Sequence, residues 1–369
     1  MKSILKPFLV AAALACAFNG PQLKRQGVHL ALFLAVAVMC MFGVLPDASA
    51  GTVLFAMAVA PFPVTPELTA VAIAYKNEKL IADAVLPRVP VGLQNFKYMT
   101  YPIGSFMTVP ETKVGRKGQP NSVEFTGDEV DGSTQDHALD DEVPIADIEN
   151  AAKQPGMPDP QMRAAEGLSE LILLAREVRT AALVFAAANY GAANKVTLAG
   201  NDQWSADHAD SQPIVDIMTG LDACVMRPNV MVIGRAAFTK LAMHPTIVKA
   251  FHGSDGDTGI VPRSFLATLF ELDEVLVGEG WVNTAKKGQA ANMTRVWGKH
   301  CALIHRNKNA DTQRGTTFGF TAQWGTRIAG AEYDGRIGMR GGQRVRTGES
   351  VKELITANDL GYFIENAVA

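Results

Sequence analysis

The sequence predicts an α+β protein built around one long helix. Between Asp159-Pro160 and Tyr190-Gly191, apolar residues recur at helical spacing. The following stretch, 206–315, alternates between short helical and short apolar strand patterns, which suggests a sheet flanked by helices. The last stretch, 316–369, is rich in strand patterns. These three observations define the predicted fold class.

Length and composition suit a protein that packs against copies of itself. The chain has 369 residues, enough for about two domains. Apolar residues make up 48% and charged residues 19%, below the usual charged share of about 25%. The net charge of −3 gives no argument for sequence-specific binding of nucleic acid.

Cysteine, histidine and glycine patterns indicate no catalytic, cofactor or metal site. The four cysteines (Cys16, Cys40, Cys224 and Cys301) form no CxxC pair, which argues against a disulfide scaffold and a zinc site. The spacing around His208 fits no standard ligand set, so we interpret it as part of a polar loop. We therefore expect a protein that is not an enzyme, with no cofactor and no metal.

The first 56 residues form an apolar leader. Two apolar runs, 7–18 and 28–45, precede Ala48-Ser49-Ala50, a combination that is similar to a secretory signal. The second run has 18 residues, near the lower limit for spanning a bilayer. The leader is thus a signal peptide, a membrane anchor, or a segment absent from the working protein. We favour the last hypothesis because Met57 opens a plausible start, and no membrane contact is expected if the leader is absent.

Residues 57–95 predict a loose N-terminal arm. Three prolines in 58–66 favour extended backbone. A short helix is expected over 67–84, and 86–90 is expected to turn the chain.

Residues 96–150 predict an extended loop that cannot bury itself. Short strand patterns are interrupted by glycines, and 119–149 holds ten acidic residues with no lysine or arginine. Such a stretch is either disordered or ordered by a partner. A two-stranded ribbon lying on a neighbouring subunit accounts for this composition.

The long helix belongs to 151–205. Asp159 and Pro160 are a good N-cap and first helical residue. About 30 residues at 1.5 Å each give a rod of roughly 45 Å, which suits a structural spine.

The remaining elements follow in order through two further segments. In 206–315 we expect helices at 213–224, 236–242, 246–251 and 263–270, and strands at 229–233, 274–277 and 301–305. In 316–369 we expect strands at 316–324, 343–348, 352–357 and 362–366.

The order of these parts resembles the major capsid proteins of tailed bacteriophages. Segments that are similar to the family are Trp204-Ser205, 213–217, 227–234, 275–278, 283–289 and 296–299. The resemblance covers about 67–369 and implies an N-arm (57–95), an extended loop (96–150), a peripheral domain with the spine helix (151–205), an axial domain (206–315) and closing strands of the peripheral domain (316–369). It implies self-assembly into hexamers and pentamers of an icosahedral shell, in the bacterial cytoplasm. The shell encloses DNA without sequence-specific binding. Scaffold, portal and decoration proteins are further implied partners.

Charged residues in the loop and near the C-terminus are candidate subunit contacts. An exposed ion pair is worth only ~0.2–1 kcal/mol, but repetition around closed rings lets small contributions select a geometry. The candidates are Lys113, Arg116, Lys117, Glu124, Asp128, Asp131, Asp140, Asp141, Arg336, Arg340, Arg344 and Arg346. Alternatively these side chains are merely solvated, or the arginines face DNA on the inner wall.

Two other functions remain open from the sequence. The leader is compatible with an exported or membrane-anchored α/β enzyme or binding protein. A phage tail-tube subunit is a further alternative, although the long helix and the α/β stretch argue against it.

Overall fold

The computed structural model describes residues 62–369, except 101–108, 123–126, 155, 207, 254, 255 and 257. The leader, the start at Met57 and the candidate Glu124 lie outside these described residues. Phe62–Ala369 forms one compact unit. Within the described residues, no helix is both long and apolar enough to cross a bilayer.

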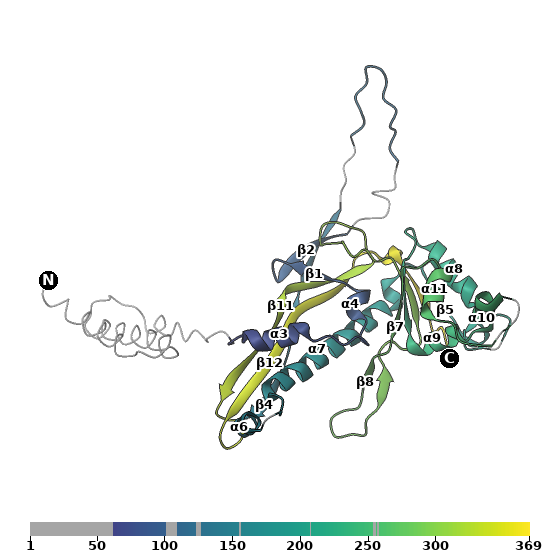
Figure 1. Cartoon of the computed structure of the whole chain (residues 1–369). Helices are drawn as coiled ribbons and strands as arrows, with labels where there is room; N and C mark the ends of the chain where they lie inside the picture. Colours follow the sequence, from purple (N-terminus) through teal and green to yellow (C-terminus); the bar gives the residue numbers. More distant parts are fainter. Residues whose placement is uncertain are drawn as a thin grey trace, which may run out of the picture. The chain divides into compact units, whose positions relative to one another are not determined.

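A four-stranded sheet occupies one part of this unit (Figure 1). Its order is β1 (Arg88–Val91), β11 (Gly319–Asp334), β12 (Gly342–Ile355) and β4 (Gln135–Pro144). β11 and β12 form a long antiparallel hairpin, β4 runs antiparallel to β12, and β1 runs parallel to β11.

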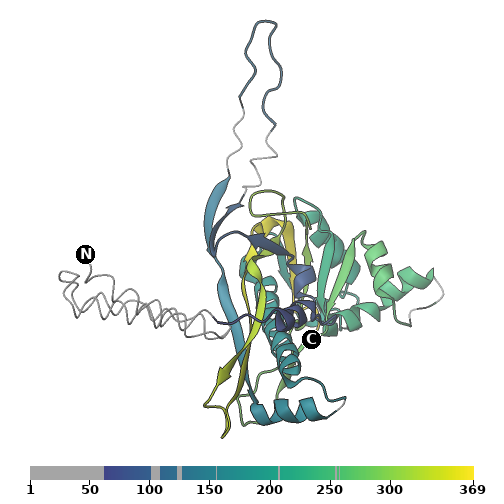
Figure 2. The ribbon, with the colours of Figure 1, turned by 60° about the vertical axis from the view of Figure 1, so that its left-hand side comes forward.

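Helices α3 (Pro66–Ala74), α6 (Ile145–Lys153) and α7 (Pro160–Val184) accompany this sheet. Figure 2 shows them on one face of it. Alternation along β11 and β12 turns Ala329 and Val345 toward the helices, where they pack with Leu168 of α7. The predicted spine helix is confirmed, with Asp159 accepting the backbone N–H of Gln161 at 2.9 Å.

The spine helix is shorter than predicted. It has 25 residues, about 37 Å, and ends at Val184 instead of Tyr190. The Tyr190 hydroxyl donates to the Val184 carbonyl at 2.7 Å, and its ring stacks on Phe318 and Phe363. The chain leaves the helix because this ring packs into the core against Phe318 and Phe363.

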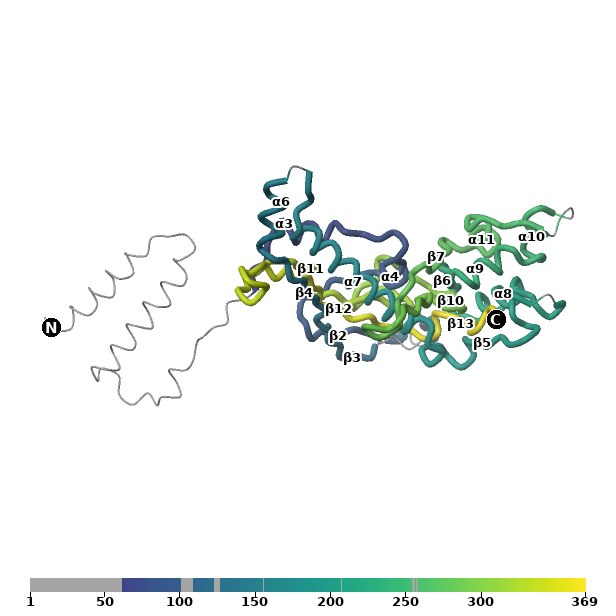
Figure 3. Tube along the Cα trace, turned by 90° about the horizontal axis from the view of Figure 1, so that it is seen from below, coloured from purple at the N-terminus to yellow at the C-terminus, as the bar shows by residue number. Residues whose placement is uncertain are grey.

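A five-stranded mixed sheet forms the other part of the unit. Its order is β5 (Lys195–Thr197), β13 (Gly361–Glu365), β10 (Cys301–Ile304), β6 (Val230–Gly234) and β7 (Glu274–Gly278). Figure 3 shows the second group of helices around β6, β7 and β10, apart from α3, α6 and α7. These helices are α8 (Pro213–Ala223), α9 (Arg235–Ala242), α10 (Pro245–His252) and α11 (Arg263–Leu269).

Both faces of the five-stranded sheet are covered, which explains the uniformly apolar β6. Met231 and Ile233 pack in the cluster that contains α8, α9 and α11. Val230 and Val232 pack in the opposite cluster, with Val184 at the end of α7. The predicted helices and strands of 206–315 are confirmed to within one or two residues at each end.

The N-terminal arm differs from its prediction. The expected helix over 67–84 is two helices, α3 and α4 (Ala82–Val85), and the expected turn at 86–90 begins strand β1. Val89 and Val91 are buried in a cluster with Phe320. Pairing with β11 therefore outweighs the tendency of two prolines to turn the chain.

The extended loop is also shorter than 96–150. β2 (Asn95–Thr100) pairs with β3 (Asp128–Ser133) as an antiparallel ribbon, but β4 joins the four-stranded sheet of the same chain, and α6 follows it. The expectation that this stretch is disordered or ordered only by a partner is wrong for β4, because β12 of the same chain pairs with it along ten residues. The stretch still buries little, since Val143 is the one buried residue of β4 and α6 has none.

Other elements complete the described residues. β8 (Trp281–Asn283) and β9 (Met293–Arg295) form a separate hairpin. β13 pairs with β10 and β5, so it belongs to the five-stranded sheet and not with the other strands of 316–369. The short 3-10 helices are Ala187–Asn189, Gly200–Asp202 and Asn358–Leu360.

Candidate assembly surfaces and the buried charge cluster

A ladder of ion pairs crosses one face of the four-stranded sheet. The register places Arg346 of β12 opposite Asp140 of β4, and both oxygens of the carboxylate accept N–H groups of the guanidinium at 2.7 Å. Arg344 contacts Asp334 at 2.5 Å and Glu142 at 3.5 Å. The hydrogen bonds from Arg346 hold the pKa of Asp140 below its usual range.

The acidic segment 119–149 and the arginines of 336–346 hold candidate subunit contacts, and that role stays a prediction. Within one chain, Asp140 and Arg346 already meet each other. They do so because β4 is a strand of the same sheet as β12.

The Arg346 guanidinium also lies over the ring of Phe62, at 4.8 Å from its centroid.

Other candidate residues are exposed and lie in separate places. Lys113, Arg116 and Lys117 lie in the exposed segment 109–122. The exposed acidic candidates on β3 and β4 are Asp128, Asp131 and Asp141, and the exposed arginines in the turn between β11 and β12 are Arg336 and Arg340. Their role in subunit contact stays a prediction.

A buried charge cluster joins the N-terminal arm, the spine helix and the four-stranded sheet. Arg88 contacts Asp83 at 2.6 Å and Glu349 at 2.8 Å. Arg327 contacts the same Glu349 oxygen at 3.2 Å, and Arg176 of α7 contacts Asp83. The Glu349 side chain is fully buried, so its charge depends on these arginines.

The pKa values in the cluster follow from burial and these charges. Burial raises the pKa of Glu349, but the positive charges of Arg88, Arg327 and Arg176 outweigh it and hold the pKa below its usual value. The pKa of Asp83 is lowered in the same way, against its burial, by Arg176 and Arg88. Burial, and then the charge of Arg88, lowers the pKa of Arg176.

Glu177 connects three parts of the fold. Its carboxylate accepts the backbone N–H groups of Ile81 and Ala82 at 3.0 and 2.7 Å, at the start of α4. It also accepts the indole N–H of Trp297 at 2.5 Å. Burial raises the pKa of Glu177, and these hydrogen bonds oppose the rise. Glu177 therefore fixes both the arm and the segment before β10 to the spine helix.

Sequence reasoning missed this cluster. The available signal was Arg176-Glu177, two charged residues on the apolar face of the long helix, between Leu173 and Ala181. Charged residues are almost never fully buried unless they are paired, so this position indicates buried partners. Their identity was not available, because Asp83, Arg88 and Glu349 are distant in sequence.

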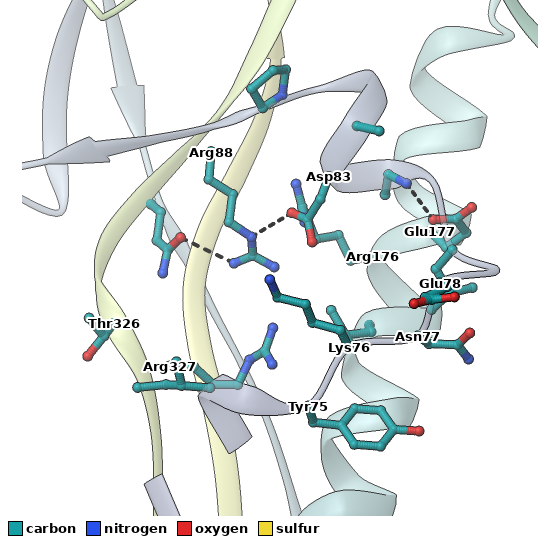
Figure 4. A pocket seen from close by; sticks show the side chains of 17 residues that line it. Tyr75, Lys76, Asn77, Glu78, Asp83, Arg88, Arg176, Glu177, Thr326 and Arg327 are labelled. Atoms are coloured by element: carbon teal, nitrogen blue, oxygen red, sulfur yellow. Dashed lines mark hydrogen bonds and ion pairs between the residues drawn. The ribbon is translucent and has the colours of Figure 1, made fainter. Parts of the chain in front are cut away.

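A hollow of about 640 Å³ opens beside the cluster. Figure 4 shows Lys76, Arg88 and Arg327 directed toward one another in this space. The apolar part of the wall is formed by Ile73, Ala82, Leu80, Ala84, Pro87 and Leu173.

The residues with metal or nucleophile chemistry lie apart. His208 contacts Asp210 at 3.0 Å in an exposed position. Cys224 and Cys301 are free and buried, and burial raises the pKa of Cys224 to about 11. In the part of the chain that the structure describes, no three His, Cys, Asp or Glu side chains are grouped as metal ligands.

Comparison with known proteins assigns the chain to a family. No protein-family model matches the chain. It is 55% identical over 313 residues to the major capsid protein of Pseudomonas phage JBD67. The matched region covers 85% of this chain and 100% of that protein. It is 27% identical over 310 residues to the major capsid protein of Burkholderia phage BcepMu, covering 82% and 95%.

A solved structure agrees with the predicted fold class. The crystal structure of a phage-related protein from Bordetella bronchiseptica RB50 matches with a TM-score of 0.65 and 25% identity, over 83% of this chain and 98% of that one. With more than half of the residues identical over the whole of a phage shell protein, the chain belongs to the family of phage major capsid proteins.

Proposed function

We propose that this chain is the structural subunit of an icosahedral shell that encloses phage DNA, and that it is not an enzyme. The observation that carries the proposal is the 55% identity over the full length of a phage major capsid protein. The spine helix and the two sheets support it, because their fold agrees with that of a phage-related protein of known structure.

We propose hexamers and pentamers of this chain as the units of the shell. Scaffold, portal and decoration proteins are further candidate partners, and the net charge of −3 supports a wall that encloses DNA without reading its sequence. The proposed location is the capsid of the virion, after assembly in the bacterial cytoplasm. The division into peripheral (151–205) and axial (206–315) domains belongs to the same proposal.

Fractionation of phage particles tests this function. Heads filled with DNA are separated from tails, and each fraction is quantified by mass spectrometry. We expect this chain to be the most abundant protein of the head fraction. Enrichment in tails would favour a tail-tube subunit, and absence from both fractions would favour an exported protein.

We also propose that the working chain starts at Met57. The match to the Pseudomonas phage protein spans 313 residues, the same length as the segment 57–369. N-terminal sequencing of the assembled protein tests this, with Met57 or Ala58 as the expected first residue. Gly51 would instead support export, and Met1 would contradict both.

A further inference from the structure

The hollow beside the spine helix brings together positive charges from three segments. Lys76 comes from the stretch between α3 and α4, Arg88 from β1, and Arg327 from β11. Their cationic groups point toward the same space (Figure 4). The guanidinium of Arg327 is buried, with 9% of its side chain exposed, so water stabilises its charge only weakly.

The carboxylates that contact these cations are shared with other arginines. The Asp83 carboxylate pairs with both Arg88 and Arg176. The Glu349 carboxylate pairs with both Arg88 and Arg327. No hydrogen bond or ion pair joins the Lys76 ammonium to any residue that the structure describes. This side of the hollow therefore carries more positive than negative charge.

The other carboxylates that line the hollow, Glu78 and Glu177, form no ion pair with Lys76, Arg88 or Arg327. Glu177 already accepts two backbone N–H groups and the Trp297 indole. Figure 4 shows Glu78 and Glu177 on the side of Asn77, away from Lys76, Arg88 and Arg327.

Several polar atoms of the cluster have no hydrogen-bond partner. Among the described residues, the Nε atom of Arg176 and the Oε1 atom of Glu349 are buried without one, and so is the Nη2 donor of Arg88. A buried donor without an acceptor costs about 1–3 kcal/mol, so an acceptor at this position is favourable. Arginine and lysine together are the usual ligands of carboxylate and phosphate groups.

We infer that this hollow binds an oxyanion, a carboxylate or a phosphate group, between Lys76, Arg88 and Arg327. The ammonium of Lys76 contributes a mobile charge at the exposed edge. The two guanidinium groups contribute fixed donors, held in place by Asp83 and Glu349. The site belongs to the single subunit and does not depend on the proposed shell function.

Inorganic phosphate is the probe that tests this site. Thermal unfolding of the unassembled full chain is measured with increasing phosphate, at an ionic strength held constant with sodium chloride. We expect phosphate to raise the melting temperature of the unaltered chain beyond the effect of chloride, because a ligand that binds the folded state stabilises it.

A pair of neighbouring lysines provides the matched comparison. Lys76→Ala is expected to weaken the apparent phosphate affinity about tenfold, the loss of one hydrogen bond to a charged group. Lys79→Ala removes another exposed lysine, which does not line the hollow, and it should leave the affinity unchanged. No phosphate effect above that of chloride, or equal affinities in the two variants, would overturn the inference.

Calorimetry on assembled shells distinguishes the source of the anion. If a carboxylate of a second copy occupies the hollow in the shell, phosphate binds the free subunit but not the shell. If a free anion is the natural occupant, phosphate binds both. Either result supports the site and assigns its occupant.

Discussion

At the scale of residues, the buried charge cluster joins the N-terminal arm, the spine helix and the four-stranded sheet through ion pairs. A single oxygen of Glu349 accepts from both Arg88 and Arg327, at 2.8 and 3.2 Å. Removing one partner of a buried ion pair leaves uncompensated charge, which is costly. One carboxylate of β12 therefore adds to the strand pairing that joins the arm to β11.

Glu349→Gln tests this dependence. We expect a free energy of unfolding lower by about 3 kcal/mol at neutral pH, measured by urea denaturation of the unassembled chain. Glu332→Gln, on an exposed residue of the same sheet, serves as the control and should change stability by less than about 0.5 kcal/mol. Equal stabilities of the two variants would contradict the assigned role of Glu349.

The effect of Glu349→Gln on the free energy of unfolding should also depend on pH. The pKa of Glu349 is lowered in the folded state, so its contribution is complete above the ordinary glutamate pKa of about 4.3. The contribution is lost as the pH falls through the folded-state pKa. The stability difference between the unaltered chain and Glu349→Gln should therefore shrink below about pH 4, and a constant difference would contradict this sign.

At the scale of elements, the backbone contact between the N-terminal arm and β11 requires a glycine on β11. Val64 forms an antiparallel bridge with Gly330, and the Thr65 N–H donates to the Ala329 carbonyl at 3.0 Å. A Cβ at Gly330 would lie 2.1 Å from the Pro63 carbonyl oxygen, which is backbone and cannot turn aside as a side chain can.

Gly330→Ala should displace this part of the arm without unfolding the β11–β12 hairpin. We expect faster hydrogen exchange of the Thr65 amide, whose bond to Ala329 is lost. Gly335→Ala is the control, since its nearest neighbour is a Tyr333 ring atom at 3.9 Å. If the Thr65 amide of Gly330→Ala exchanges as slowly as in the unaltered chain, the close contact between the arm and Gly330 is refuted.

Local patterns predicted most elements, and long-range pairing accounts for the misses. α7 began where its cap and proline indicated, because these signals act within one turn. β1 and β4 were misjudged because their stabilising neighbours, β11 and β12, lie about 200 residues further along the chain. A proline-containing or acidic segment carries no local sign that a distant strand will pair with it.

The candidate site was predictable only in part. The charged character of Asp140 and Arg346 was visible in the sequence, but their pairing follows from strand register. The cluster around Arg176 was marked only by charge on an apolar helix face. The hollow was invisible, because it is formed by segments that meet only in the folded subunit.

At the scale of the whole molecule, we propose that Arg344 and Arg346 also contact neighbouring subunits in the assembly. Arg344→Glu with Arg346→Glu should lower the particle yield, measured by density-gradient sedimentation. The monomer should remain folded, because both side chains are more than a third exposed and their pairs are worth about 1 kcal/mol or less. Normal yield from the double variant would contradict a role in subunit contact.

A charge swap separates contacts within the chain from contacts between chains. Asp140→Arg with Arg346→Glu restores the pair of opposite charges across β4 and β12. If Arg346 also contacts a neighbouring subunit, the chain with both substitutions should still give a low particle yield. Full recovery of assembly would confine the role of Arg346 to its own subunit.

The central claim, a subunit of a closed icosahedral shell, is tested most directly by cryo-electron microscopy of the assembled protein. We predict closed particles in which the unit Phe62–Ala369 repeats in hexamers and pentamers. Open helical tubes without five-fold vertices, or a protein that stays monomeric in phage-producing cells, would contradict it.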